Sequence, residues 1–250
     1  MKDTFRIIAT VALVTLLIAS LYALAMEVLE MRESKRDIER VYRTLEEAEL
    51  QKNSEESPEE EEWVAKYIAL AEENAEFFGW IHVDGTDIDL PVMHSPERPG
   101  YYLKHSFWGK YSDYGTPYLD ERCVPDISNN YVVYGHNMRN GTMFAQLHRY
   151  ESEEFWEEHP HIQFDTLTEK GTYEIFSVFH FDAEHEGYWF NAHTCMGEME
   201  VCEFLREALA RQLYETGIEP VYGDQFLTLC TCDRTYRNGR FFVLARKVVT

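Results

Sequence analysis

The first apolar stretch of the chain has the length of a membrane-spanning helix. Residues 7–26 carry no charged side chain and are nearly all apolar. An α-helix of this length spans about 30 Å, the thickness of the hydrocarbon core of a bilayer. Lys2 and Arg6 precede the stretch, whereas Glu27 and Glu30 follow it. Because basic residues favour the cytoplasmic side, the pattern predicts an anchor with a cytoplasmic N-terminus and the rest of the chain outside the cell.

A cleavable signal peptide is the alternative interpretation of this stretch. Ala23, Leu24 and Ala25 resemble a small-residue cleavage site. The apolar stretch is, however, longer than the apolar core of a usual signal peptide. Its length favours an uncleaved anchor, with residues 1–6 as a short cytoplasmic segment.

Residues 27–62 are rich in charged side chains and are predicted to form a helical and acidic stalk. Apolar side chains recur at helical spacing within residues 27–51, which predicts an amphipathic helix. These side chains are Ile38, Val41, Tyr42 and Leu45. A dense acidic run then predicts a solvated, mobile spacer. The run consists of Glu55, Glu56 and Glu59 through Glu62. A second helix is predicted over about residues 61–76, ending near Gly79.

From residue 79 onward the apolar positions follow the pattern of short β-strands. Strands are predicted over residues 80–83, 88–93, 131–134, 172–181, 226–232 and 240–248. A short helix is predicted over residues 143–150, and a longer one over residues 198–216. The longer helix is expected to bury Phe204, Leu205, Ala208 and Leu213 and to close at Gly217. Many strands, few helices and no alternation of strand and helix predict a mainly β fold, a closed or half-closed barrel with helical insertions.

The length and charge of the chain limit its function. The 250 residues fit one sizeable core, in residues 63–250, together with the anchor and stalk. Acidic residues outnumber basic ones by 45 to 23, which gives a net charge of −22. Because the phosphate backbone of a nucleic acid binds basic surfaces, this charge argues against a nucleic-acid partner.

The five cysteines do not form a zinc-binding pattern, because the sequence contains no CxxC or CxxH pair. We therefore predict no metal site. Cys123, Cys195 and Cys202 are interpreted as small buried side chains. Cys230 is interpreted in the same way, with a strained disulfide to Cys232 or a shared metal as the alternatives.

Three residues at strand ends could together perform thiol-based acyl transfer. Cys232 offers a thiol, whose thiolate is the nucleophile. His136 follows an apolar strand and could move a proton, while Arg240 begins the last strand and could stabilise an oxyanion. Each residue type occurs in most chains, so the spacing alone is weak evidence. His180, within a predicted strand, is interpreted as structural.

The segments that carry these residues resemble those of the sortase family. Residues 228–232 read Thr-Leu-Cys-Thr-Cys and match the family's T-L-x-T-C signature, with cysteine at the variable place. Arg240, eight positions after Cys232, matches the sortase arginine. Residues 134–137, Tyr-Gly-His-Asn, match the histidine segment. Residues 79–92 and 101–120 are similar to class B members in particular, and the resemblance covers about residues 63–249.

The resemblance implies an eight-stranded sortase barrel, anchored outside a Gram-positive cell by the N-terminal helix. It implies a cysteine transpeptidase that cleaves a C-terminal sorting signal after threonine, often of Pro-x-Thr type in class B. The surface protein then passes to an amine of the peptidoglycan cross-bridge, on lipid II or in the wall. Cys232 would form the thioester, His136 would act as acid and base, and Arg240 would stabilise the oxyanion. Thr231, with Leu229 and Thr228, would contact substrate, and no cofactor or metal is needed.

Two other functions remain open at this point. A cysteine peptidase on the same scaffold would hydrolyse the sorting signal without using an amine acceptor. A non-catalytic anchored surface domain would show no unusual reactivity at Cys232.

Overall fold

Eight β-strands form a closed barrel in the computed structural model, which describes residues 2–52, 59–185 and 190–248. Their order around the barrel is β1-β2-β3-β4-β7-β8-β6-β5, and β5 pairs with β1 to close it. The strands are β1 (Phe77–Val83), β2 (Asp89–Met93), β3 (Tyr118–Leu119), β4 (Asn130–Tyr134), β5 (His161–Thr166), β6 (Thr172–Asp182), β7 (Phe226–Asp233) and β8 (Gly239–Lys247). The predicted mainly β barrel is confirmed.

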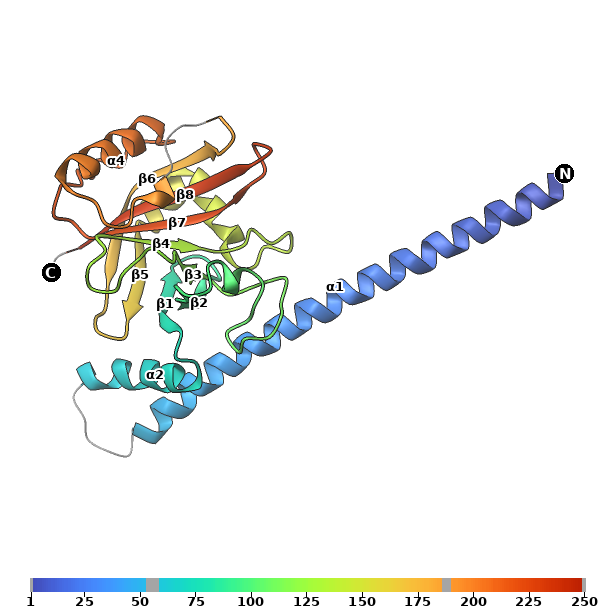
Figure 1. Ribbon diagram of the computed structural model, residues 1–250, viewed down its shortest axis with the longest axis horizontal. Helices are drawn as coiled ribbons and strands as arrows, with labels where there is room; N and C mark the ends of the chain where they lie inside the picture. The colour runs from blue at the N-terminus through green and yellow to red at the C-terminus, as the bar shows by residue number, and fades with distance from the viewer. Residues whose placement is uncertain (1, 53–58, 186–189, 249–250) are drawn as a thin grey trace.

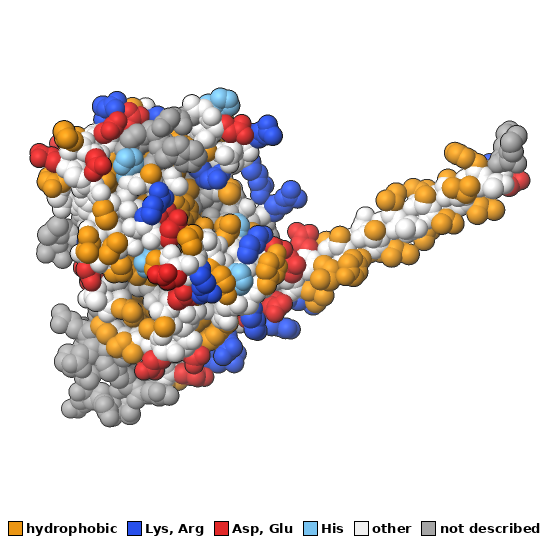
Figure 2. All heavy atoms as spheres, viewed as in Figure 1, with side chains coloured by type: hydrophobic (Ala, Val, Ile, Leu, Met, Phe, Trp, Pro, Cys, Tyr) orange, Lys and Arg blue, Asp and Glu red, His pale blue; other side chains and the backbone are white. Residues whose placement is uncertain are grey.

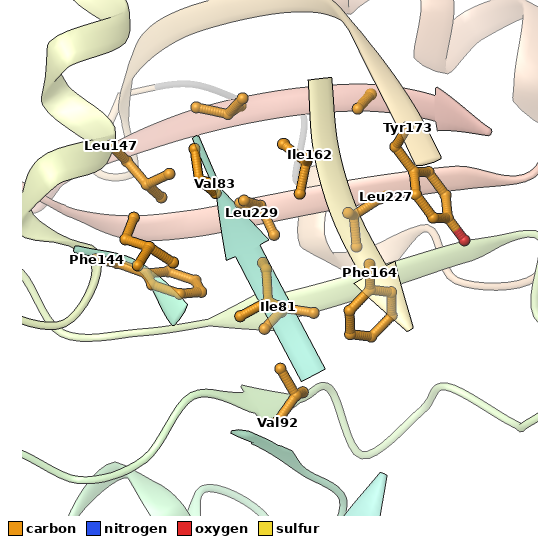
Figure 3. Close-up of a cluster of buried hydrophobic side chains, with 14 of the residues drawn as sticks. Ile81, Val83, Val92, Phe144, Leu147, Ile162, Phe164, Tyr173, Leu227 and Leu229 are labelled. Carbon is orange, nitrogen blue, oxygen red and sulfur yellow. The ribbon is translucent and has the colours of Figure 1, made fainter. Parts of the chain in front are cut away.

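The interior of the barrel is filled by apolar side chains from every part of the sheet. Figure 3 shows Ile81 and Val83 of β1, Ile162 and Phe164 of β5 and Leu229 of β7 gathered in this core. All five are at most 1% exposed. The core therefore holds β7 rigidly from within, which fixes the strand that carries Cys232.

Two strand pairings, one parallel and one antiparallel, decide which residues meet at one end of the barrel. β4 pairs with β7 in parallel, and β7 pairs with β8 antiparallel. The C-terminal ends of β4 and β7 therefore lie beside the N-terminal end of β8. These three ends place His136, Cys232 and Arg240 on the same side of the molecule.

The helices lie outside the barrel (Figure 1). They are α1 (Lys2–Lys52), α2 (Glu59–Glu73), α3 (Glu153–Glu158) and α4 (Glu198–Arg211), with short 3₁₀ helices η1 (Tyr101–Leu103), η2 (Phe144–Glu151) and η3 (Phe190–Ala192). α4 packs on β6 through buried Val201, Phe204 and Ala208, while η2 covers one end of the barrel.

The predicted anchor and stalk helix are one continuous helix, α1. By length and composition α1 could cross a membrane, with a mean hydropathy of 2.5 in its most apolar window, and it is the one such helix in the described residues. None of that window is buried against the rest of the protein. Figure 2 shows the N-terminal half of α1 covered by apolar side chains on all visible sides and projecting away from the barrel.

The second half of α1 packs against the barrel and α2. Val41 is fully buried, and Leu45 lies with it in a cluster that includes Trp80. The Tyr42 hydroxyl donates to the Asp89 carbonyl at 2.6 Å, and Trp108 Nε1 donates to the Asp37 carbonyl at 3.1 Å. The apolar face predicted for the stalk therefore attaches the stalk to the barrel.

The structure corrects two helix ends. α2 ends at Glu73, not near Gly79, because Asn74 turns the chain: its side chain accepts from the backbone N–H of Glu76. α4 ends at Arg211, before the predicted residue 216, because the backbone N–H of Leu213 donates to Val178 of β6 instead. Leu213 is consequently 42% exposed, and its predicted burial was wrong.

Part of the predicted acidic spacer, Glu55 and Glu56, lies outside the described residues, whereas Glu59 through Glu62 form the first turn of α2.

Candidate active site

Cys232 and Arg240 face each other across two neighbouring strands. In the β7–β8 ladder they are direct partners. Side chains of directly opposed residues have Cβ atoms about 4.5–5.5 Å apart. Cys232 is exposed and Arg240 is half-buried, so both can be reached from solvent. The register of the hairpin thus brings the predicted nucleophile and the predicted cation together.

His136 is held beside Cys232 by hydrogen bonds to β7 from both of its sequence neighbours. The Gly135 N–H donates to the Cys230 carbonyl at 3.2 Å, and Thr231 Oγ1 donates to the Gly135 carbonyl at 2.7 Å. On the other side, Asn137 Nδ2 donates to the Cys232 carbonyl at 2.8 Å. These bonds fix the backbone that carries the imidazole relative to the thiol.

The three predicted residues line one cavity of about 310 Å³. Most of the remaining wall is aromatic or apolar, and it is formed by Leu103, Tyr118, Tyr134, Phe181 and Phe242, with Asn191 beside them. Such a cavity suits an extended peptide whose side chains are mainly apolar, with the polar atoms of the site placed at the reacting bond.

The His136 imidazole is in its neutral form at neutral pH. Burial lowers its pKa below the ordinary 6.5, and the hydrogen bond to Leu103 offsets only part of that effect. Nε2 lies 2.7 Å from the Leu103 carbonyl oxygen. A carbonyl can only accept, so Nε2 carries the hydrogen and Nδ1 is the nitrogen that can take a proton.

Hydrogen bonds to the turn between β7 and β8 orient the guanidinium of Arg240. Nη1 donates to the Gly239 carbonyl at 2.9 Å and to Asn238 Oδ1 at 3.2 Å. Arg234 and Arg237 lie in the same turn, but neither lines this cavity. The Arg237 side chain is 89% exposed, and Arg234 lines a separate, open cavity. Position therefore favours Arg240 as the cation that meets a substrate.

The other residues of the motif differ in their access to the cavity. Thr231 lines it, although its hydroxyl already donates to Gly135. Thr228 and Leu229 are fully buried and do not line it. Thr228 Oγ1 donates to Asn130 Oδ1, and Leu229 packs inside the barrel. Successive residues of a strand face opposite sides, so Leu229 points into the barrel and Thr228 points to the other face of β7. Their contact with a substrate stays a prediction.

Cys230 is a buried thiol, as the sequence predicted. It is 2% exposed and unpaired, and burial raises its pKa to about 12 although nearby Arg240 lowers it. The strained disulfide with Cys232 is absent among the described residues. The predicted burial of Cys123 is confirmed, but Cys195 and Cys202 are exposed. Cys202 lies on the solvent side of α4, where helical spacing places it opposite the buried stripe.

A hydrogen-bonded network that the sequence did not reveal holds one wall of the cavity. The Tyr134 hydroxyl donates to Asp120 Oδ2 at 2.7 Å and accepts from Asn191 at 2.9 Å. Arg122 binds Asp120 through two nitrogens and donates to the Asn191 carbonyl at 2.7 Å. Burial favours the neutral form of Asp120, but these hydrogen bonds outweigh it and lower its pKa. No residue pattern marked Asn191 or Leu103 in advance.

A second set of polar side chains lies behind the thiol. His148 Nε2 is 3.3 Å from the Cys232 carbonyl oxygen, and its Nδ1 is 2.7 Å from Glu151. His180 Nδ1 is 2.7 Å from Asp233, the residue after Cys232. This contact fits the structural role predicted for His180. Within the described residues, no group of three or more potential ligands could hold a metal ion.

Gly135 is required by the close approach of η2. A Cβ at this position would lie 2.4 Å from the ring of Phe144, which is fully buried. Any side chain at residue 135 would push either η2 or the His136 backbone out of place.

The comparisons with known proteins point to one family. Residues 81–248 match the model of the sortase domain family. The curated sortase B of Listeria monocytogenes is 27% identical over 71% of this chain and 71% of its own length. The crystal structure of Clostridium perfringens sortase B is 32% identical and covers 72% of this chain and 98% of its own, with a TM-score of 0.66. The Staphylococcus aureus sortase B–substrate complex has a TM-score of 0.74 and covers 88% of this chain and 98% of its own, at 22% identity, which shows the shared fold.

Proposed function

Because the chain belongs to the sortase family of cysteine transpeptidases, we propose that it is a class B enzyme that attaches surface proteins to the cell wall. Its catalytic residues are Cys232, His136 and Arg240. The observation that carries this proposal is the joint position of the three side chains around one cavity, with Cys232 and Arg240 paired across β7 and β8.

The first half-reaction forms a thioester. His136 Nδ1 takes the proton of the Cys232 thiol, and the sulfur attacks the carbonyl carbon of the peptide bond after the threonine of a sorting signal, so that a C–S bond forms as the carbonyl π bond opens to an oxyanion. Arg240 stabilises the negative charge on the oxygen of the tetrahedral intermediate. When the C–N bond breaks, His136 gives its proton to the leaving amine. The surface protein is then held on Cys232.

The second half-reaction transfers the protein to an amine of the peptidoglycan cross-bridge, on lipid II or in the wall. The amine attacks the thioester carbon while His136 takes its proton. A new C–N bond forms, the C–S bond breaks, and the Cys232 thiolate recovers a proton from His136, which regenerates the thiol and the neutral imidazole. Neither half-reaction needs a metal or a cofactor.

The location of the enzyme follows from α1. Residues 7–26 span the cell membrane, with the N-terminus in the cytoplasm and the barrel outside. The hydropathy and full exposure of that part of α1 support this arrangement.

The proposed chemistry is tested by trapping the thioester. The full chain in detergent micelles is incubated with peptides of the form x-Pro-x-Thr-x, and its intact mass is measured. We expect an adduct that hydroxylamine or an amine acceptor releases. Cys232→Ala should form none, whereas Cys202→Ala, which removes another exposed thiol, should form it as the wild type does.

An adduct that persists in Cys232→Ala would overturn the assignment of the nucleophile. If water released the adduct from Cys232 but none of the amine acceptors accelerated its release, the enzyme would be a peptidase. Loss of adduct in both variants would point to misfolding, which the thermal unfolding midpoint of each variant checks.

A further inference from the structure

Three loops around the catalytic cavity form a basic surface on an acidic protein. They comprise residues 104–113, 138–142 and 234–238, which flank His136 and Cys232. Together they contain five basic residues and one acidic residue, Asp113, in a chain with a net charge of −22. The basic residues are Lys104, Lys110, Arg139, Arg234 and Arg237. We call this surface the basic rim.

The basic rim also exposes aromatic side chains. Tyr111 is 67% exposed and Tyr236 is 40% exposed. Tyrosine has an apolar ring and a polar hydroxyl, and it is enriched where proteins meet the headgroup region of a bilayer. Exposed tyrosines among lysines and arginines are the composition expected of a surface that lies on anionic lipids.

The basic rim lies beside the point where α1 would leave the membrane. Glu30 contributes to the raised pKa of Lys104, which is mainly caused by the hydrogen bond to Asp113. Glu27 adds to the raised pKa of Tyr114, whose main cause is burial. At a rise of 1.5 Å per residue, Glu27 and Glu30 are about 2–6 Å beyond the last residue of the apolar stretch, Met26. That distance lies within the headgroup layer, about 5–8 Å thick on each side.

Side-chain contacts hold the first loop of the basic rim to α1, and a hydrogen bond links the second loop to the residue after the first. Arg40 of α1 lies over the ring of Trp108 at 3.6 Å, and Trp108 Nε1 donates to Asp37 of α1. Asn140 in the second loop donates to the hydroxyl of Tyr114, the residue that follows the first loop, at 3.0 Å. Figure 1 shows the loop after β4 and the β7–β8 turn extending toward the same side as the N-terminal half of α1.

We propose that the basic rim binds the headgroups of anionic phospholipids on the outer face of the membrane, so that the catalytic cavity opens beside the bilayer. This inference rests on the proposed anchoring by α1. In this position the enzyme meets sorting signals and lipid-linked acceptor amines at the surface of the membrane. The α1 helix alone tethers the barrel, whereas the basic rim sets its orientation.

The test compares the full chain in nanodiscs of phosphatidylcholine alone and of phosphatidylcholine with phosphatidylglycerol. Hydrogen–deuterium exchange is measured for peptides covering the three rim loops, with peptides of β5 and β6 as an internal reference. We expect exchange in the rim to slow at least about threefold when phosphatidylglycerol is present, and to recover at high salt. Exchange in the reference peptides should not change.

Paired variants identify the charges responsible. Lys110→Ser, Arg139→Ser and Arg237→Ser together should abolish the effect of phosphatidylglycerol. The control removes three exposed basic residues away from the rim, by Arg43→Ser, Lys170→Ser and Arg206→Ser, and should retain it. Equal exchange in the two lipids, or a rim variant that behaves as the control, would overturn the proposal.

The outcome is independent of the proposed chemistry. Retention of the chain in vesicles after an alkaline wash reports on α1, and trapping of the thioester reports on Cys232. A chain that is retained and forms the thioester, but whose rim ignores the lipid, refutes lipid binding alone.

Discussion

At the scale of single residues, the hydrogen bond between His136 and Leu103 sets the protonation chemistry of the site. It assigns the hydrogen to Nε2 and leaves Nδ1 for proton transfer. Because burial lowers the pKa of the imidazole, the ring is uncharged at neutral pH. In the proposed mechanism, His136 therefore starts the cycle as a neutral base, which can accept the proton that the Cys232 thiol must lose.

The pH dependence of catalysis tests this assignment. The acid limb of the kcat/KM profile should have an apparent pKa below 6.5, because protonation of His136 removes its accepting nitrogen. Lys104 also lowers the pKa of His136, so Lys104→Gln should move the limb to higher pH. Lys110→Gln, a charge removed from the same loop, is the control. An apparent pKa above 6.5 for the acid limb of the wild-type profile would contradict the effect assigned to the burial of His136.

The geometry of Arg240 predicts that charge alone will not replace it. Arg240→Lys keeps a cation but loses the planar set of donors, so kcat/KM should fall about 100-fold or more. Arg237→Lys, in the same turn, should have little effect because that side chain is 89% exposed and outside the cavity. Steady-state transpeptidation assays, with a peptide that forms the thioester in the trapping experiment, give kcat/KM for both variants. Equal activity of the two variants would remove Arg240 from the mechanism.

The residues found in advance are those that belong to a contiguous motif. Cys232 and Arg240 could be predicted together because each matches a motif of the family and each lies at the end of a predicted strand, whereas their direct pairing in the β7–β8 ladder comes from the structure. Leu103 and Asn191 could not, because they reach the cavity through loops whose paths depend on tertiary contacts. Thr228 and Leu229 were predicted to contact substrate because the motif contains them, but the motif does not indicate that both side chains are buried.

At the scale of elements, β7 is anchored on the side away from the cavity by Asp233 and His180. Burial alone would raise the pKa of Asp233, but hydrogen bonds from Thr235 and His180 outweigh it and lower the pKa. A carboxyl group with a lowered folded pKa stabilises the fold above its unfolded pKa, about 3.9, and loses that effect as pH falls through the folded value. The end of β7 is therefore an acid-sensitive part of the barrel.

Asp233→Asn should lower the stability at neutral pH by about 2 kcal/mol, because a charged hydrogen bond is lost in a buried place. The difference from the wild type should shrink as pH falls below the unfolded pKa of about 3.9 and through the lower folded pKa. Thermal unfolding midpoints over this range provide the measurement. The matched control is Asp182→Asn, which breaks an exposed Asp–His pair of the same 2.7 Å length and should change little. Similar losses in both variants would exclude the role given to burial.

Element boundaries were predicted well where strands are long and poorly where side-chain contacts end a helix. β6 and β8 match their predicted ranges to within one residue at each end. α4 stops early because Leu213 pairs with β6, a contact that no local pattern contains. β5 was missed although its side chains alternate between buried and exposed, and β3 has only two residues, too few for a pattern.

At the scale of the whole molecule, α1 is part of the folded unit as well as the proposed anchor. Val41 and Leu45 pack in the cluster that contains Trp80 of β1. The sequence predicted the amphipathic face of this helix but not what it covers, because helical spacing does not identify a partner. We therefore propose that the independently stable unit begins before residue 63.

Truncation tests this extended unit. A chain that begins at Glu27 should unfold at the same temperature as the full chain. A chain that begins at Trp63 lacks Val41 and Leu45, worth about 2 kcal/mol each, so its midpoint should be roughly 10 °C lower. Circular dichroism melts compare the two. Equal midpoints would show that α1 adds nothing to the barrel.

The long-range pairing of β4 with β7 has a consequence for how the enzyme is made. Thr231 and Gly135 are hydrogen-bonded although they are 96 positions apart in the chain. Pairings of this separation have a large entropic cost of loop closure and form slowly. Since β7 and β8 follow the other six strands in the sequence, a growing chain can neither close the barrel nor assemble the site until both have been synthesised. In the membrane orientation proposed above, a chain exported before that point would cross unfolded, and its catalytic site would form together with the barrel on the far side.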